Sequence, residues 1–231
     1  MKQNTQKCST APGDAAMKAH VHPAPEATAL YALSGARKYL NADERRAVLD
    51  EIDTLPLDRR LFALTLFWTG ARISEVLALR GLSFQPSRGV VAIHTLKRRR
   101  RAIRELPVPP SLVIALDRRF NLAALGDALL WPWCRTTGWR IIRGVMDAAR
   151  LSGPAASPRG LRHGFAIDAL RHAVPLTLLQ KWMGHARLAT TAIYADASGP
   201  EERAFAQQLW VEASSRRAAR PLHYNPRRSQ P

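Results

Sequence analysis

Apolar residues recur at a helical period along most of the chain from residue 40 onward. Asn41 followed by Glu44 matches a capping box and predicts the start of a helix, which Pro56 ends. A second, mostly apolar helix is expected at 57–69, where Gly70 ends it, and a third follows directly. Further helices are predicted at 109–120, 137–151, 159–172, 175–183, 189–196 and 201–213.

A short part of the chain changes to the period of a strand. Residues 89–95 and 103–108 predict two paired strands, with the basic run 97–101 at the tip of the hairpin between them. The whole pattern predicts a mostly α (α+β) fold, in which helices surround a small antiparallel β-sheet.

The organisation along the chain is expected to be one domain with two tails. Residues 1–39, rich in Ala, Pro and polar residues, predict a mostly disordered tail that can hold one short helix. The packed domain is expected at 40–213, and residues 214–231 form a basic C-terminal tail.

Charge adds the first functional signal. The chain has 35 Lys and Arg against 18 Asp and Glu, a formal net charge of +17. Such an excess favours a polyanionic partner, and nucleic acid fits best. A membrane surface is less favoured because no separate basic amphipathic helix is present, and charge for solubility alone is the plain alternative.

Other classes of protein are disfavoured by what the sequence contains. No apolar run approaches the length that spans a bilayer, and the first residues lack the apolar centre of a secretory signal. Cys8 and Cys134 are the only cysteines, which suits neither a disulfide framework nor a zinc cluster. The expected location is a reducing cytoplasm.

Two pairs of charged residues have helical spacing. Arg72 and Glu75 share a helix face after the Gly70 turn, so Arg72 is placed to reach a phosphate or to form a surface ion pair. Arg159 and Arg162 form a second possible phosphate clamp, or else a solvated basic face.

His185 and Tyr194 follow later in the chain. His185 lies just past a helix that Gly184 ends, and Tyr194 lies on the next predicted helix. Taken singly, each fits a structural role at least as well as a chemical one.

Four segments together resemble the tyrosine recombinases, or phage integrase family. They are TGARISEVLAL (69–79), the hairpin lysine Lys97, LRHGFA (161–166) and GHARLATTAIY (184–194), in the order and at the spacing of that family. The resemblance covers about residues 40–213 and implies an integrase-like catalytic domain. It also implies double-stranded DNA as substrate, a homo-oligomer (a tetramer) on DNA, and no metal, cofactor, membrane or small-molecule substrate.

The resemblance assigns roles residue by residue. Tyr194 matches the nucleophile that forms a 3′-phosphotyrosine, and Arg72 and Arg162 match the arginines that hold the phosphate. Lys97 matches the general acid, and His185 a hydrogen-bond donor to the phosphate. The supporting residues are Glu75, which matches an acidic residue that orients these groups, and His163.

The choice of lysine at position 97 supports its role independently. The chain holds six lysines among 29 arginines, and Lys97 is followed by the expected DNA-binding residues Arg98, Arg99, Arg100 and Arg101. Arginine cannot give up a proton near neutral pH, whereas lysine can, and we expect the neighbouring cations to lower the pKa of Lys97. The alternative is that Lys97 is one more phosphate contact.

Two features depart from the family pattern. Arg159, still counted with the catalytic residues, stands where the family usually has histidine; arginine is a very poor base, so the acceptor of the Tyr194 proton is unassigned. Only about 40 residues precede the pattern, so a separate protein is one candidate to replace the usual N-terminal DNA-clamping domain. Helix 201–213 either docks into a neighbouring protomer or packs on its own domain.

The sequence therefore predicts a site-specific recombinase or integrase that breaks and rejoins double-stranded DNA. One alternative is a catalytically weak or inactive DNA-binding accessory protein. Another is a relaxing enzyme of the type IB topoisomerase kind, which shares the chemistry without exchanging partners.

Overall fold

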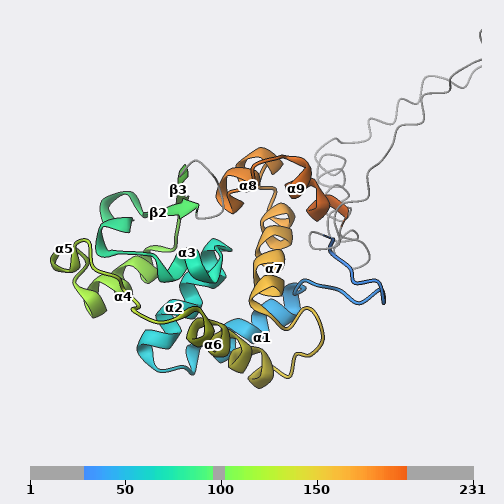
Figure 1. The fold of residues 1–231 in the computed structure, drawn as a ribbon, viewed down its shortest axis with the longest axis horizontal. Coiled ribbons are helices and arrows are strands. Elements are labelled where there is room, and N and C mark those ends of the chain that lie inside the picture. Colours follow the sequence, from blue (N-terminus) through green and yellow to red (C-terminus); the bar gives the residue numbers. More distant parts are fainter. Residues whose placement is uncertain (1–28, 96–101, 197–231) are drawn as a thin grey trace, which may run out of the picture.

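The computed structural model describes residues 29–95 and 102–196. The described residues are mostly helical and hold one small antiparallel sheet, as the sequence predicts (Figure 1). The α-helices of the described residues are α1 (Ala42–Asp53), α2 (Leu57–Thr69), α3 (Ile73–Leu77), α4 (Pro110–Phe120), α5 (Leu122–Leu125), α6 (Arg135–Ala148), α7 (Pro158–Arg171), α8 (Leu176–Met183) and α9 (Ala189–Ala192). None of these helices is long and apolar enough to cross a membrane.

The first two helices begin and end where the local signals place them. The side chain of Asn41 accepts a hydrogen bond from the Glu44 amide at 2.8 Å, and the Glu44 carboxylate accepts one from the Asn41 amide at 2.8 Å. This confirms the predicted capping box. Helix α2 ends at Gly70, whose φ of +57° is left-handed. A Cβ at Gly70 would lie 2.3 Å from the Phe165 ring, so this turn requires glycine.

The sheet has three strands in the order β1-β2-β3. The predicted hairpin is β2 (Val90–Thr95) with β3 (Ala102–Pro107), paired antiparallel from Val90 opposite Pro107 to Thr95 opposite Ala102. The tip of this hairpin, with Lys97 and the four arginines after it, lies outside the described residues. The short β1 (Phe84–Gln85) and the 3₁₀ turns around it have no counterpart in the prediction, since two or three residues show no period.

The C-terminal helices agree with the prediction except in one segment. The helix expected at 189–196 is a single α-turn, α9, followed by a 3₁₀ turn, η3 (Ile193–Asp196), and Tyr194 lies on that turn. Helix α7 packs against α2, α1, α8 and η3, so it occupies the centre of the molecule (Figure 1). The predicted helix 201–213 and the tail 214–231 lie outside the described residues.

The segment before α1 packs on the domain. Leu30 and Tyr39 are buried in a small apolar cluster with residues of α7, α8 and η3. Residues 31 and 37 pair in an isolated bridge, and the described part of this segment holds turns rather than the short helix considered for it. Only residues 1–28 of the predicted N-terminal tail lie outside the description.

Candidate active site

A cavity of about 380 Å³ collects the chemistry-bearing residues that the sequence singles out. It lies where the beginnings of α3 and α7 meet the segment from α8 to η3. The predicted site residues on its wall are Arg72, Arg159, Arg162, His163, His185 and Tyr194. These residues come from three separate segments of the sequence, around 72, 159–163 and 185–194, and the fold brings the segments together.

Glu75 is buried behind the cavity and does not lie on a solvated surface. Its side chain is 0% exposed, so the simple surface ion pair is the wrong interpretation. Nη1 of Arg72 donates to Oε1 of Glu75 at 2.9 Å, and the Arg72 amide donates to Oε2 at 3.0 Å. Nη2 of Arg104 donates to the same Oε2 at 2.7 Å. The Glu75 carboxylate therefore bridges the guanidinium groups of Arg72 and Arg104.

The pKa of Glu75 reflects these contacts. Burial alone would raise this pKa, but the hydrogen bond and charge of Arg104, with those of Arg72, lower it below its ordinary value. The carboxylate therefore stays ionised and holds the Arg72 guanidinium at the cavity wall.

Arg104 is a site-supporting residue that the sequence prediction missed. It is buried, although it follows the basic run 97–101 closely in the sequence. Its Nη1 donates to Oγ1 of Thr95 at 2.9 Å, and its Nε donates to the Trp182 carbonyl at 2.7 Å. The available signal was its alternation with buried Leu106, which places both side chains on the core face of β3.

Arg162 is buried as well, so the solvated basic face is wrong for this residue. It donates to the carbonyls of Gly70 and Met183, both at 2.6 Å, and Nη2 lies 3.2 Å from Nε2 of His185. Burial, with the nearby charge of Arg72, lowers the pKa of Arg162 to about 10, so it remains a cation at neutral pH. Three of its five N–H groups are engaged in these bonds, which leaves two to meet a ligand.

His185 is held as a neutral imidazole. Burial and the charges of Arg162 and Arg72 lower the pKa of His185 to about 3. Because Arg162 can only donate, Nε2 of His185 accepts from it, and Nδ1 carries the proton toward Oγ1 of Thr191 at 3.0 Å. The ring also stacks on Tyr194 at 6.2 Å between centroids. Donation from His185 to a phosphate stays a prediction.

Tyr194 is buried in the cavity wall, with 1% of the residue exposed. Its hydroxyl lies 3.0 Å from Nδ1 of His163. Burial raises the pKa of Tyr194 to about 12, against the opposing charges of Arg162 and Arg72. Burial and neighbouring cations lower the pKa of His163 to about 4, so this imidazole is neutral.

The wall of the cavity is rich in arginine. Arg135, from the first turn of α6, joins Arg72, Arg159 and Arg162 on its wall. Arg135 lies outside the family-like segments, and nothing in its sequence neighbourhood marks it. No Asp or Glu of residues 29–95 and 102–196 lies on that wall, so the cavity is a site for an anion. Among the described residues, no three His, Cys, Asp or Glu side chains gather to hold a metal ion.

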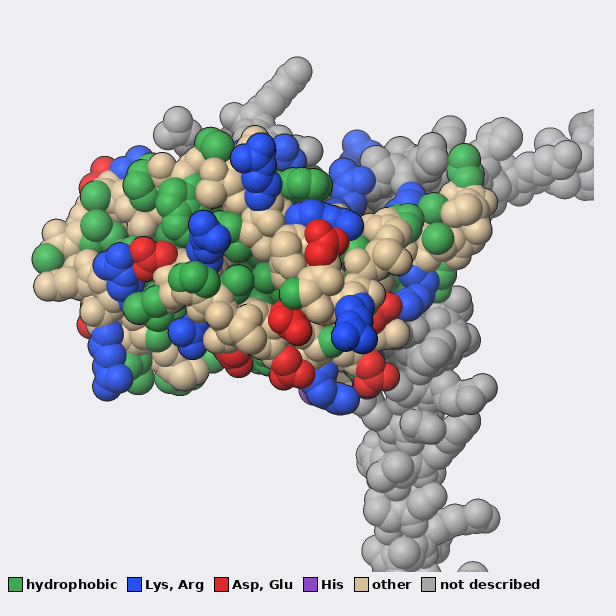
Figure 2. Space-filling view, turned by 90° about the horizontal axis from the view of Figure 1, so that it is seen from below, with side chains coloured by type: hydrophobic (Ala, Val, Ile, Leu, Met, Phe, Trp, Pro, Cys, Tyr) green, Lys and Arg blue, Asp and Glu red, His purple; other side chains and the backbone are tan. Residues whose placement is uncertain are grey.

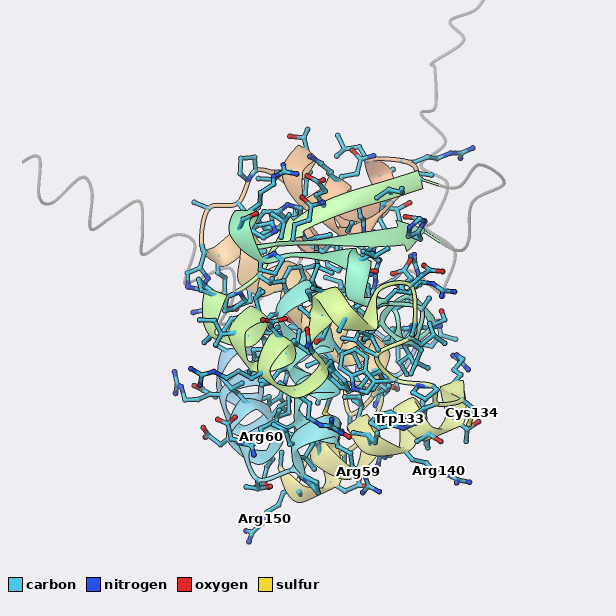
Figure 3. The ribbon with its side chains drawn as sticks, turned by 90° about the vertical axis from the view of Figure 1, so that its left-hand side faces the viewer. Arg59, Arg60, Trp133, Cys134, Arg140 and Arg150 are labelled. Atoms are coloured by element: carbon cyan, nitrogen blue, oxygen red, sulfur yellow. The ribbon has the colours of Figure 1, made fainter. Side chains whose placement is uncertain are left out.

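Positive charge elsewhere is arranged differently. On the face seen in Figure 2, Lys and Arg side chains are interspersed with Asp and Glu. Arg59, Arg60 and Arg150 lie at the end of the molecule away from α8 (Figure 3). The cavity wall gathers arginines without Asp or Glu among the described residues, whereas the face seen in Figure 2 mixes the two signs of charge.

Comparison with known proteins places the chain in a family. The model of the phage integrase family matches residues 38–200. A resolvase of Escherichia coli K12 is 30% identical over 68% of this chain and 70% of its own length. Tyrosine recombinase XerA of Pyrococcus furiosus is 26% identical, over 68% of this chain and 56% of the relative. The chain spans about half the length of the first curated relatives it matches.

Solved structures agree on the fold. The crystal structure of XerA recombinase aligns with a TM-score of 0.62 and 22% identity, over 76% of this chain and 64% of the other. The catalytic domain of bacteriophage HP1 integrase aligns with a TM-score of 0.50 and 20% identity, over 68% of this chain and 86% of that domain. The mostly helical fold with its small sheet is thus that of integrase catalytic domains, and the chain belongs to the phage integrase family.

Proposed function

We propose that this protein is a site-specific recombinase that breaks and rejoins double-stranded DNA through a 3′-phosphotyrosine at Tyr194. The observation that carries the proposal is the buried Tyr194 hydroxyl in a cavity whose wall, in the part of the chain that the structure describes, holds four arginines and no acidic residue. Membership of the phage integrase family supports it. A solved structure with a TM-score of 0.56, the Tn1549 transposon integrase, is described in complex with transposon right end DNA, which supports DNA as the partner.

The reaction begins with the scissile phosphate among the cavity arginines. The lone pair of the Tyr194 hydroxyl attacks phosphorus, and the bond from phosphorus to the 5′ oxygen breaks. Lys97 gives its proton to that leaving oxygen. The phosphotyrosine bond conserves the energy of the broken ester, so a 5′ hydroxyl can reverse the step on the same or another strand without a nucleotide cofactor.

The arginines act on the charge that gathers in the transition state. Arg162 is fixed by two backbone carbonyls and Arg72 by Glu75, so neither has to be reorganised when the phosphate becomes pentavalent. Arg159 adds charge from the exposed edge of the cavity. Removing one such fixed donor typically slows a reaction by about 10²–10³-fold.

The assembly on DNA follows from the number of bonds that must break. Exchange between two duplexes breaks four strands, and each break uses one tyrosine, so four protomers form the complete complex. A reducing cytoplasm, where exposed Cys134 stays a free thiol, is the compartment proposed for the reaction.

The test is covalent trapping on duplexes that carry a nick near candidate cleavage positions. Wild-type protein is expected to yield a protein–DNA species on a denaturing gel, and Tyr194→Phe to yield none. Tyr31→Phe, outside the cavity, serves as the matched control and should behave as wild type. If wild type only shifts DNA on a native gel across many sequences and on supercoiled DNA, the accessory-protein alternative replaces the proposal. Relaxation of plasmids without exchange between two sites would instead indicate a topoisomerase-like enzyme.

A further inference from the structure

The attack by Tyr194 leaves a proton that needs an acceptor. The phenol is a weak acid in this site, since burial raises the pKa of Tyr194 to about 12. Arg159, at the position where the family-like pattern would supply a base, cannot accept a proton at neutral pH. Two histidines remain on the cavity wall, His163 and His185, and only one of them is placed to act.

His185 is excluded by its own hydrogen bonds. Its Nε2 accepts from Arg162, and its Nδ1 carries a proton toward Thr191. Its ring lies against the Tyr194 ring in a stack rather than pointing a nitrogen at the hydroxyl. Accepting the tyrosine proton would require His185 to release Arg162 or Thr191.

We propose that Nδ1 of His163, 3.0 Å from the Tyr194 hydroxyl, is the general base of the cleavage step. This inference rests on the proposed recombinase function and names the acceptor in it. As the oxygen of Tyr194 bonds to phosphorus, its proton moves to Nδ1 and His163 becomes an imidazolium. In the rejoining step the phosphotyrosine bond breaks, and the same proton returns from Nδ1 to the phenolic oxygen.

The tautomer that this role requires is compatible with the surroundings of His163. Nε2 of His163 is buried and has no hydrogen-bond partner among residues 29–95 and 102–196. A donor bonded to Nε2 would make that nitrogen the acceptor and force the proton onto Nδ1. No such donor is present in that part of the chain. With the proton on Nε2 instead, Nδ1 accepts from the Tyr194 hydroxyl and satisfies that buried donor.

The charged groups around His163 hold it ready to accept. Burial and then the charges of Arg162, Arg159 and Lys38 lower its pKa to about 4, and no acidic group of the described residues counteracts them. Arg159 and Arg162 lie on α7, and Lys38 lies before α1. The titratable groups that His163 faces from other elements are Tyr194 on η3 and His185. A DNA phosphate beside the arginines would offset their charge, so the pKa of His163 should rise when DNA binds, which makes it a stronger base.

The experiment measures the rate of covalent complex formation in a single turnover on nicked duplex, from pH 6 to pH 9. His163→Asn puts an amide near the position of Nδ1, where it can hydrogen-bond to Tyr194 but cannot take up a proton. His94→Asn, exposed on β2 and outside the cavity, is the matched control. DNA affinity and the circular dichroism spectrum are recorded for each variant.

The expected result is a loss of about 10²-fold or more in the cleavage rate of His163→Asn at neutral pH, with DNA affinity kept. The remaining rate should climb about tenfold per pH unit, because hydroxide then removes the proton, whereas wild type and His94→Asn stay nearly flat. Replacing Tyr194 by a more acidic fluorotyrosine should restore much of the lost rate. A purely structural role would lower the rate equally at all pH values and would not respond to the acidity of the phenol.

Each other outcome overturns a specific statement. If wild type forms the covalent complex and His163→Asn does so equally fast, His163 is not the base, while the recombinase proposal stands. If wild type forms no covalent complex, the proposed function and this inference both fall. If His163→Asn does not fold, the test uses wild type. Its cleavage rate must decrease at pH values below the pKa of His163, as NMR titration gives that pKa in the DNA complex. A cleavage rate that does not follow that pKa rejects the proposal.

Discussion

Removing the charge of Glu75 should destabilise the fold more than any exposed ion pair can. Glu75→Gln keeps the size of the side chain but replaces an acceptor oxygen by a donor amide that faces an arginine. The buried guanidinium of Arg104 then loses its carboxylate partner, and Arg72 loses the group that holds it.

The magnitude follows from burial. Both Glu75 and Arg104 are almost completely excluded from water, with side-chain exposures of 0% and 5%. Breaking a buried ion pair by changing one partner typically costs about 3–5 kcal/mol, because the other charge is left without compensation. A domain is stable by only about 5–15 kcal/mol, so this loss is a large part of the total.

The assay is urea unfolding at neutral pH, followed by circular dichroism. Glu105→Gln is the matched control, because Glu105 pairs with Arg88 on the surface, where side-chain exposures are 39% and 59%. That control should change the free energy of unfolding by less than about 1 kcal/mol. If Glu75→Gln costs no more than Glu105→Gln, the buried bridge does not stabilise the fold and the reasoning is wrong.

Three further predictions follow. Folding lowers the pKa of Glu75, so the stabilisation that its charge gives the fold is complete above the unfolded pKa of about 4.3 and is lost as pH falls. The difference in unfolding free energy between wild type and Glu75→Gln should therefore shrink below about pH 4. A difference that stays constant would contradict this. Gly160→Ala should destabilise by about 1–3 kcal/mol, since its Cβ would lie 1.8 Å from the Ala155 carbonyl oxygen. A Cβ at Gly144 would meet no atom within 4 Å, so Gly144→Ala should instead stabilise the fold by about 0.5–1 kcal/mol. Equal changes in melting temperature for Gly160→Ala and Gly144→Ala would contradict both predictions. DNA affinity should fall at least tenfold between about 50 and 200 mM salt. Arg159→Ala should lower the slope of log affinity against log salt concentration by about one, while Arg59→Ala, outside the cavity, leaves this slope unchanged. An affinity that does not change with salt would exclude an arginine-lined phosphate site.

The parts of the fold that the sequence predicts well are those with local causes. The Asn41 capping box, the Gly70 turn and the two hairpin strands are determined by neighbouring residues, and the structure confirms all three. The segment around Tyr194 was predicted as one helix, but the stretch is a single α-turn and a 3₁₀ turn. Such short turns are too brief for periodicity to identify.

The supporting contacts of the site depend on residues far apart in the sequence. An arginine three residues before a glutamate gives the same pattern whether the pair is exposed or buried. Buried Glu75 bonds to Arg104, 29 residues away on a strand, and Tyr194 contacts His163 across 31 residues. Motif spacing identifies these residues as a set, but it does not show which atoms touch.

If Tyr194 becomes joined to a DNA 3′ phosphate, mass spectrometry can detect that bond directly. Covalent complex trapped on nicked duplex is digested with nuclease and trypsin, and the peptide 188–203, whose one tyrosine is Tyr194, is sequenced. We expect a nucleotide remnant linked through its 3′ phosphate to Tyr194. A linkage to another residue, or through a 5′ phosphate, would contradict it.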